Sequence, residues 1–185
     1  MPLSHLPPTR RVIPGGGPDL RRDAPRGVIH HSGDAPAEVG RAYSHTVRTV
    51  ARILLGLFLL FAGTAHLTFA REEFRAQVPP WVPLDVDLVV VLSGVVELAL
   101  GLALVLAARR HRALVGWVTA AFFVAIFPGN VAQWLEGRDA FGLDTDTARF
   151  ARLFFQPVLV AWALWSTGAW RAWRERRRRA PRGGG

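Results

Sequence analysis

Cysteine and lysine are both absent from this chain of 185 residues. Without a thiol, the chain cannot form a disulfide, a thiolate–zinc site, a cysteine nucleophile or a dithiol redox centre of its own. All 23 basic residues are therefore arginine, and they outnumber the 14 acidic residues to give a formal net charge of +9. Because these arginines flank apolar segments, we expect them to set membrane topology and contact membrane lipids, and we expect no nucleic acid as a partner.

Long apolar runs, by contrast, make up most of the chain after residue 50. Four segments of 18–23 residues contain no charge apart from a single glutamate: Ile53–Ala70, Leu88–Ala108, Ala113–Leu135 and Leu153–Trp170. At about 1.5 Å per residue, each segment can cross a bilayer core of about 30 Å. The short connections between them predict an all-α polytopic membrane protein, folded as an antiparallel four-transmembrane-helix bundle.

Composition divides the chain into three regions. Residues 1–45 contain seven prolines and no helical or strand period, which predicts a disordered tail. Residues 46–170 hold the transmembrane domain, and residues 171–185 form a basic tail. Arginines gather beside the first segment, at Arg109–Arg112 and in the basic tail, whereas the loops on the other side mix arginine with acidic residues. This distribution predicts a multi-pass protein of the cell membrane with both termini in the cytoplasm.

Two pairs of glycines recur at a spacing of seven residues in the first two segments. Gly56 and Gly63 lie in the first, and Gly94 and Gly101 lie in the second. Small residues at this spacing let helix backbones approach closely, so the first two helices are predicted to pack tightly together.

Glu97 stands at the centre of the second segment and is its only charged residue. A carboxylate at this depth costs about 2.5–3.5 kcal/mol on insertion scales, so it is expected to face the interior of the bundle. With both termini in the cytoplasm, the rise per residue places a polar cluster in the outer half of the bundle. This candidate site consists of His66, Ser93, Glu97, Asn130, Gln133 and Gln156. We identify no catalytic residue and no metal-ligating set among them.

Three roles for this cluster stay open from the sequence. The side chains can hold helices in register through interhelical hydrogen bonds, bind the headgroup of a small molecule such as a quinone, or pass a proton or ion. Pro128 and Pro157 interrupt the third and fourth segments and leave the carbonyls of Val124 and Leu153 without their helical donors. We expect the neighbouring Asn130 and Gln156 to help satisfy those carbonyls, and kinks at the prolines to widen the outer half.

Three motifs resemble the DoxX-like family of small four-helix membrane proteins. The stretch GLFLLFAGTAHLTFAREEFRAQVPPWVP places His66 at the end of a helix, before a proline-rich turn. LSGVVELALGLALVL carries Ser93 and Glu97, and FPGNV carries Asn130, where family members often show Pro-Ala-Asn. Together they span Leu54 to Trp165, about 60% of the chain.

The resemblance implies a membrane protein linked to respiratory or sulfur redox chemistry, since founding members of that family are associated with quinol oxidase or thiosulfate–quinone oxidoreductase complexes. The leading hypothesis is therefore an accessory or quinone-contacting subunit of a membrane redox complex, with other redox subunits as partners and no cofactor of its own besides a bound quinone. The alternatives are a non-enzymatic membrane chaperone or assembly factor, and a small transporter, which the lack of an evident internal repeat disfavours.

Overall fold

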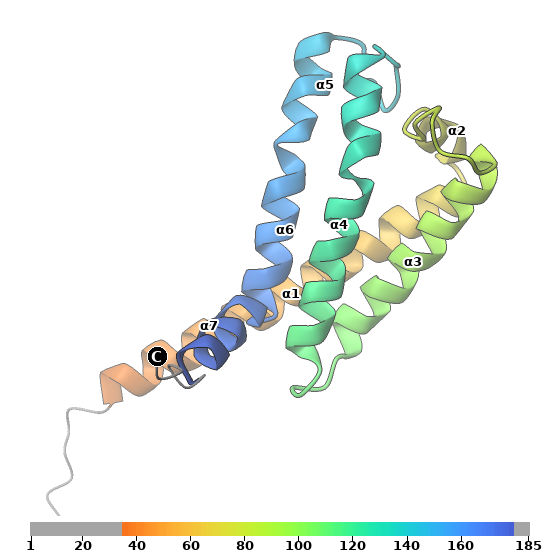
Figure 1. Ribbon diagram of the computed structural model, residues 1–185. Coiled ribbons are helices and arrows are strands. Elements are labelled where there is room, and N and C mark those ends of the chain that lie inside the picture. Colours follow the sequence, from red (N-terminus) through yellow and green to blue (C-terminus); the bar gives the residue numbers. More distant parts are fainter. Residues whose placement is uncertain (1–34, 180–185) are drawn as a thin grey trace, which may run out of the picture.

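The computed structural model describes residues 35–179, and within this range every regular element is a helix. The helices are α1 (Ala35–Leu67), α2 (Arg71–Arg75), α3 (Val86–Leu106), α4 (Arg112–Leu135), α5 (Asp146–Leu153), α6 (Phe155–Ser166) and α7 (Ala169–Arg179). Figure 1 shows α5 and α6 as one column beside α4, with α3 on the other side of α4. The all-helical class predicted from the sequence is confirmed for the described residues.

Three of these helices are long and apolar enough to cross a membrane: α1 from Glu38 onward, α3 and α4. Their outward faces carry large apolar side chains, such as Phe61 on α1, Leu92 on α3 and Leu114 on α4, which are 50–65% exposed. In water such a surface would be costly, whereas hydrocarbon covers it favourably. The structure therefore supports a membrane protein, as the apolar runs predicted.

The glycine pairs form the seam between α1 and α3. A Cβ atom on Gly63 would lie only 2.7 Å from the carbonyl oxygen of Gly94, and one on Gly101 would lie 2.7 Å from the carbonyl oxygen of Gly56. Real Cβ atoms do not approach a carbonyl oxygen so closely, so only glycine permits this backbone contact. The tight packing predicted from the spacing of seven residues is confirmed.

The core lies where α1 and α3 meet α4 and α6. Leu55, Leu59, Leu104 and Phe123 are nearly inaccessible to solvent and pack in one cluster with Ala163. The indole nitrogen of Trp162 on α6 also donates a hydrogen bond of 2.9 Å to the carbonyl of Ala51 on α1. This contact joins helices that are more than 100 residues apart along the chain.

The first helix begins earlier than the sequence predicted. Residues 35–45 belong to α1, although they were assigned to the disordered tail 1–45, so this part of the prediction is corrected. The first 34 residues of that tail, and residues 180–185 of the basic tail 171–185, lie outside the described residues. Glu38 in the first turn of α1 favours a helix start here, because a negative charge interacts well with the amino end of a helix.

The fourth apolar segment is not one continuous helix. Pro157 cannot donate to the carbonyl of Leu153, and the hydrogen-bond pattern changes at Phe154, whose N–H reaches the carbonyl of Ala151 although its φ of −71° and ψ of −20° remain helical. The segment then ends at Ser166, because Gly168 adopts a φ of +74° and turns the chain into α7. The apolar segment Leu153–Trp170 is therefore divided at Phe154 and again at Thr167 and Gly168, with α6 as its longest helical part.

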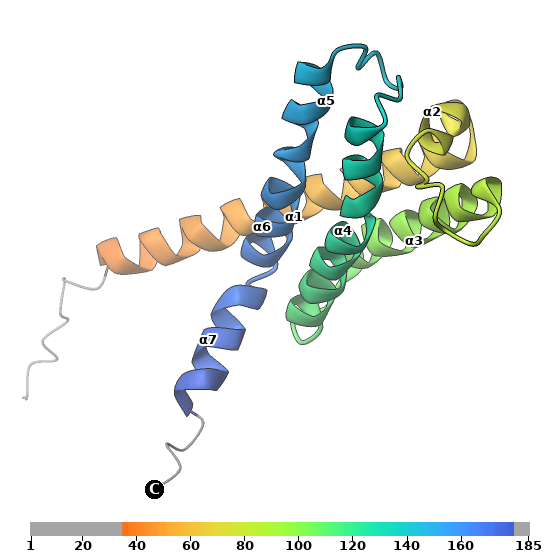
Figure 2. The ribbon, with the colours of Figure 1, turned by 45° about the horizontal axis from the view of Figure 1, so that its top comes forward.

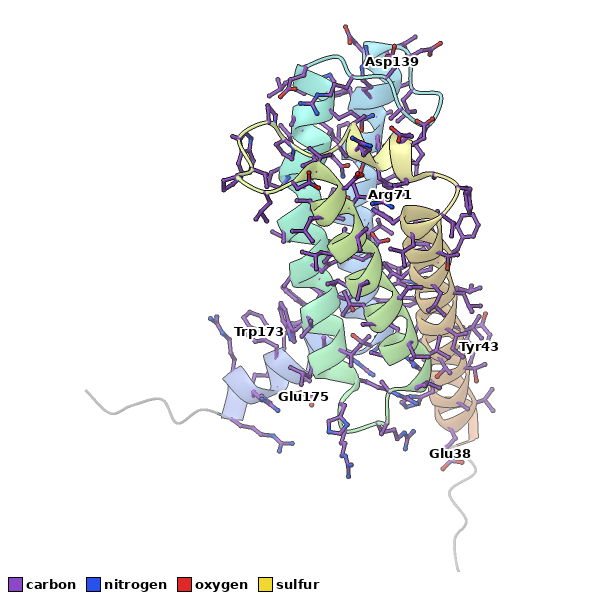
Figure 3. The ribbon with its side chains drawn as sticks, turned by 90° about the vertical axis from the view of Figure 1, so that its right-hand side faces the viewer. Glu38, Tyr43, Arg71, Asp139, Trp173 and Glu175 are labelled. Atoms are coloured by element: carbon purple, nitrogen blue, oxygen red, sulfur yellow. The ribbon has the colours of Figure 1, made fainter. Side chains whose placement is uncertain are left out.

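The two ends of the molecule differ in composition. Figure 3 shows Arg71 and Asp139 at one end, and Glu38, Trp173 and Glu175 at the other. We call the first the α2 end, formed by α2 with residues 76–85 and 136–145. The second is the α7 end, formed by α7, the start of α1 and residues 107–111. Figure 2 shows α7 extending from the end of α6, away from the other helices.

Candidate functional site

A cavity of about 790 Å³ lies toward the α2 end, between α1, α3, α4 and α6. Cavities of this size are typical of sites that hold a small organic molecule. Five of the six residues of the predicted polar cluster line it: His66, Ser93, Glu97, Asn130 and Gln156. Four separate helices contribute them, so the fold brings together side chains that lie up to 90 residues apart in the sequence.

His66 and Glu97 face each other across the seam between α1 and α3. Nδ1 of the imidazole lies 3.0 Å from Oε2 of the carboxylate, and both side chains are more than 90% buried. The same Nδ1 atom lies 2.9 Å from the carbonyl oxygen of Ala62, one turn earlier on α1. A single N–H on Nδ1 cannot satisfy both oxygens, and its direction in the ring plane favours the carbonyl of Ala62.

The carboxylate of Glu97 is therefore left without a hydrogen-bond donor. Oε2 is inaccessible to solvent and makes no hydrogen bond within the described residues. Ser93, one turn earlier on α3, does not donate to Oε2 either, although it lines the same cavity. A buried acid of this kind usually pairs with another group, because an unmet acceptor costs about 1–3 kcal/mol or more. Glu97 also lines the cavity, so its carboxylate is a candidate acceptor for a hydrogen bond from a molecule there.

Asn130 and Gln156 form a second polar group on the opposite wall. The amide nitrogen of Asn130 donates to Oε1 of Gln156 over 3.0 Å, and Gln156 in turn donates to the carbonyl of Phe123. Gln156 was expected near the carbonyls that the prolines leave without donors, but it contacts the carbonyl one residue before Val124. Asn130 keeps its second amide hydrogen, which this network does not use.

Gln133 does not line the cavity. It is almost fully buried on α4, where its amide donates to the carbonyl of Arg138 and its oxygen accepts from Arg152 over 3.2 Å. Gln133 therefore positions Arg152, whose side chain does line the cavity.

A row of stacked side chains covers the cavity toward the α2 end. The ring of Phe74 on α2 lies against His66, with centroids 3.3 Å apart and planes 17° from parallel. Phe141 meets Phe74 edge-on at 4.8 Å, and the guanidinium of Arg152 lies 4.8 Å from the centroid of Phe141. These contacts link α1, α2, the loop before α5, and α5 in one stack.

No pattern in the sequence singled out Phe74, Phe141 and Arg152 as residues of the site. Phe74 is separated from His66 by the turn at residues 68–70, so no helical spacing connects them. Arg152 directly precedes the apolar segment Leu153–Trp170, where an arginine is typical of a membrane boundary and does not by itself indicate a site. One signal was present, because Arg152 lies four residues before Gln156 and such pairs share a helix face.

The loop that follows α2 completes the cover. A Cβ on Gly129 would lie 2.6 Å from the carbonyl oxygen of Gln77, so the loop rests directly on the backbone of α4. Arg138 also donates to the carbonyls of Ala76 and Val78, over 3.2 and 2.9 Å. The two loops of the α2 end are thereby tied together above the cavity.

The site combines an acceptor, donors and aromatic surfaces. Glu97 offers a free carboxylate oxygen, Asn130 offers an amide hydrogen, and Phe74, Trp81 and Phe141 offer ring surfaces. Within the part of the chain that the structure describes, no group of three His, Asp or Glu side chains is arranged to hold a metal ion. The arrangement suits a small, flat molecule that has both a hydrogen-bonding edge and an apolar body.

Residues 55–167 match the family described as domain of unknown function DUF8561. The match covers more than half of the chain and includes all four helices that line the cavity, so the chain belongs to this family. No curated protein and no solved structure matches the chain.

Proposed function

We propose that the protein is a DoxX-like, quinone-contacting accessory subunit of a membrane redox complex. The observation that carries this proposal is the carboxylate of Glu97, which is buried beside His66 and has no donor within the described residues, at the wall of a cavity of about 790 Å³. The resemblance of the motifs around His66, Glu97 and Asn130 to the DoxX-like family adds the redox context. The other subunits of the complex are its partners.

A quinone headgroup matches the chemistry of the cavity. Its reduced form carries two hydroxyls, so one can donate to Glu97 while the oxygen of the other accepts from the free amide hydrogen of Asn130. The flat ring suits the aromatic cover formed by Phe74 and Phe141. The isoprenoid tail would leave between helices into the bilayer, where Phe61 and Phe155 border the cavity and are about two-thirds exposed.

We further propose that the protein lies in the cell membrane and that α6 forms the fourth crossing. Four crossings place both termini on the same side, in the cytoplasm. With 12 residues, α6 spans only about 18 Å, and the second half of α5 would supply the remainder. The outward side chains of α6 support this, since Phe155, Val158 and Trp165 are 45–66% exposed. The excess of arginine at the α7 end supports the orientation.

Thermal unfolding of the detergent-solubilised protein with a short-chain ubiquinol, the reduced form that carries the hydroxyl donors, tests the quinone site. A ligand at about one hundred times its Kd stabilises the folded state by about 2.7 kcal/mol, which for this size raises Tm by roughly 5–10 °C. We expect this rise in the wild type and in Thr119→Ala, a buried polar variant on α4 outside the cavity. His66→Ala should lose most of it.

If the Tm of the wild type does not change with the short-chain ligand in its oxidised or its reduced form, the quinone proposal is overturned. In that case, a fall in Tm for His66→Ala larger than that for Thr119→Ala would assign the cluster to interhelical contacts. An assembly role would then be the better candidate, because such a role uses helix faces and needs no occupied cavity.

A further inference from the structure

A second hollow, a groove of about 640 Å³, runs along the outside of α4 and α6 to the start of α7. Its walls are apolar over most of their length, with Val124 and Phe127 from α4, and Val160 and Leu164 from α6. At the α7 end the lining changes to two arginines and two tryptophans, Arg48, Arg171, Trp165 and Trp170. An apolar channel with a cationic end is the shape that complements one lipid molecule.

Arg48 and Arg171 both lie close to Gly168, at the turn between α6 and α7. A Cβ atom placed on Gly168 would lie 3.9 Å from Nη1 of Arg48 and 3.9 Å from Nη2 of Arg171. Gly168 has no Cβ, and its φ of +74° is the conformation that turns α6 into α7 and brings Arg171 back toward α1. The turn therefore creates a small open space with a guanidinium on either side.

The guanidinium of Arg48 lacks a partner at this point. Its Nη1 atom is inaccessible to solvent and makes no hydrogen bond within the described residues. Its contact with Trp165, whose ring centroid lies 5.7 Å from the guanidinium carbon, is a cation–π contact and satisfies no N–H donor. Five N–H donors in a planar fork match the paired oxygens of a phosphate or a carboxylate.

No carboxylate neutralises this pair within the described residues. The ion pairs formed by arginine there involve Arg71, Arg75 and Arg138 at the α2 end, and Arg149 on the adjoining α5. Two like charges near a low-dielectric surface repel each other, and a shared anion between them converts this repulsion into attraction. The groove itself is lined by no acidic residue.

We propose that this groove binds one anionic glycerophospholipid, with its phosphate between Arg48 and Arg171 and an acyl chain along α4 and α6. A headgroup with net negative charge is favoured over a zwitterionic one, because the groove offers no acid to pair with a choline or ethanolamine. Trp165 and Trp170 lie at the level of the headgroup, where indole rings are preferred. This proposal needs only a membrane-embedded chain and is independent of the quinone site.

The test measures lipid binding to the full chain in a mild non-ionic detergent, by native mass spectrometry and by the shift in Tm. Dioleoyl phosphatidylglycerol should bind at least tenfold more tightly than dioleoyl phosphatidylcholine. Arg48→Gln and Arg171→Gln should each lower phosphatidylglycerol affinity by about five- to tenfold, since each basic residue near the surface contributes about 1 kcal/mol. Arg174→Gln, the same change on the same helix but outside the groove, should have little effect.

A second pair of variants fills the groove without changing charge. Ala161 is exposed and lines the groove, so Ala161→Phe should exclude the acyl chain and lower binding at least tenfold. Ala121→Phe places the same ring on an exposed face of α4 outside either hollow and should not change binding.

Three outcomes would overturn the proposal. The first is equal binding of the two lipids, and the second is equal loss of binding in Arg174→Gln and Arg171→Gln. The third is full competition by millimolar inorganic phosphate with Ala161→Phe unaffected, which would indicate a site for free phosphate and no acyl chain. If Arg48→Gln does not fold, the comparison of Ala161→Phe with Ala121→Phe still decides the matter.

Discussion

Gly94 leaves the space that the side chain of His66 occupies. A Cβ atom on Gly94 would lie 2.8 Å from the Cβ of His66, less than the distance at which two carbons can meet without displacement. Glu97 follows Gly94 by one turn of α3, and its carboxylate lies 3.0 Å from the imidazole. The packing seam and the pair of His66 and Glu97 are therefore one structural unit, so a substitution in the seam should shift these two side chains at the cavity wall.

The substitution Gly94→Ala tests this unit. The added methyl group must push α1 and α3 apart, and overpacking of this kind costs about 1–3 kcal/mol. We expect a lower Tm and a loss of quinone protection, because His66 moves away from Glu97. Gly40→Ala is the matched control: nothing lies within 4 Å of its Cβ, and alanine in a helix should be neutral or stabilise it by up to about 1 kcal/mol.

Glu97 should behave as a site residue and contribute little to folding. Since Oε2 makes no hydrogen bond within the described residues, Glu97→Leu should leave Tm in the absence of ligand unchanged or higher. The same variant should abolish the Tm rise caused by a short-chain quinol, whereas Glu97→Gln should retain part of it, because the amide oxygen still accepts a hydrogen bond from the quinol hydroxyl. A drop of several degrees for Glu97→Leu without ligand would instead identify Glu97 as a structural anchor.

Removal of the Phe141 side chain should leave the free energy of unfolding almost unchanged but weaken quinone binding. Its φ of +56° is unfavourable for a residue with a Cβ, at a cost of about 1–2 kcal/mol, and Phe141→Gly removes that strain. The stacking lost with Phe74 is worth about 0.5–1.5 kcal/mol, so the two effects nearly cancel in the free energy of unfolding. Quinone affinity should fall, because the cavity loses part of its cover. Unchanged affinity, measured by the same titration, would separate Phe141 from the site.

Single introduced cysteines can map the topology, since the natural chain has none to label in the background. In intact cells, a membrane-impermeant maleimide should label Asp144→Cys, and should reach Arg110→Cys and Arg176→Cys only after permeabilisation. All three positions are exposed. Labelling of Arg176→Cys in intact cells would show that α6 does not cross the membrane, leaving three crossings.

Local patterns in the sequence predicted the parts of the fold that depend on them. The apolar runs of α1, α3 and α4 and the glycines of the seam act over one or two turns, and the structure contains them where expected. Depth along each helix also predicted that His66, Glu97 and Asn130 would lie at related heights, because rise per residue is nearly constant. Which side chains of the polar cluster face the cavity depends on the rotation of each helix about its axis. Gln133 does not line the cavity and contacts Arg138 and Arg152 instead.

Other features depend on contacts between distant segments, so no local pattern revealed them. Phe74 and Phe141 reach the cavity because two loops fold back over α4, an arrangement that Gly129 permits and Arg138 holds. The break at Phe154 follows from Pro157, which was visible in the sequence. Its severity was not predictable, because a proline in a membrane helix can produce anything from a slight kink to a full interruption.

The cover of the cavity has a consequence for how any occupant arrives. The loops tied by Arg138 close the α2 end, while the exposed rings of Phe61 and Phe155 border the cavity on its flank. A molecule dissolved in the bilayer would then enter from the side. Occupancy of the cavity would depend on the mole fraction of that molecule among the lipids, and not on its concentration in water. Affinities from detergent titrations should accordingly shift with the ratio of ligand to detergent. Only reconstitution at a fixed lipid ratio would make values for different tail lengths comparable.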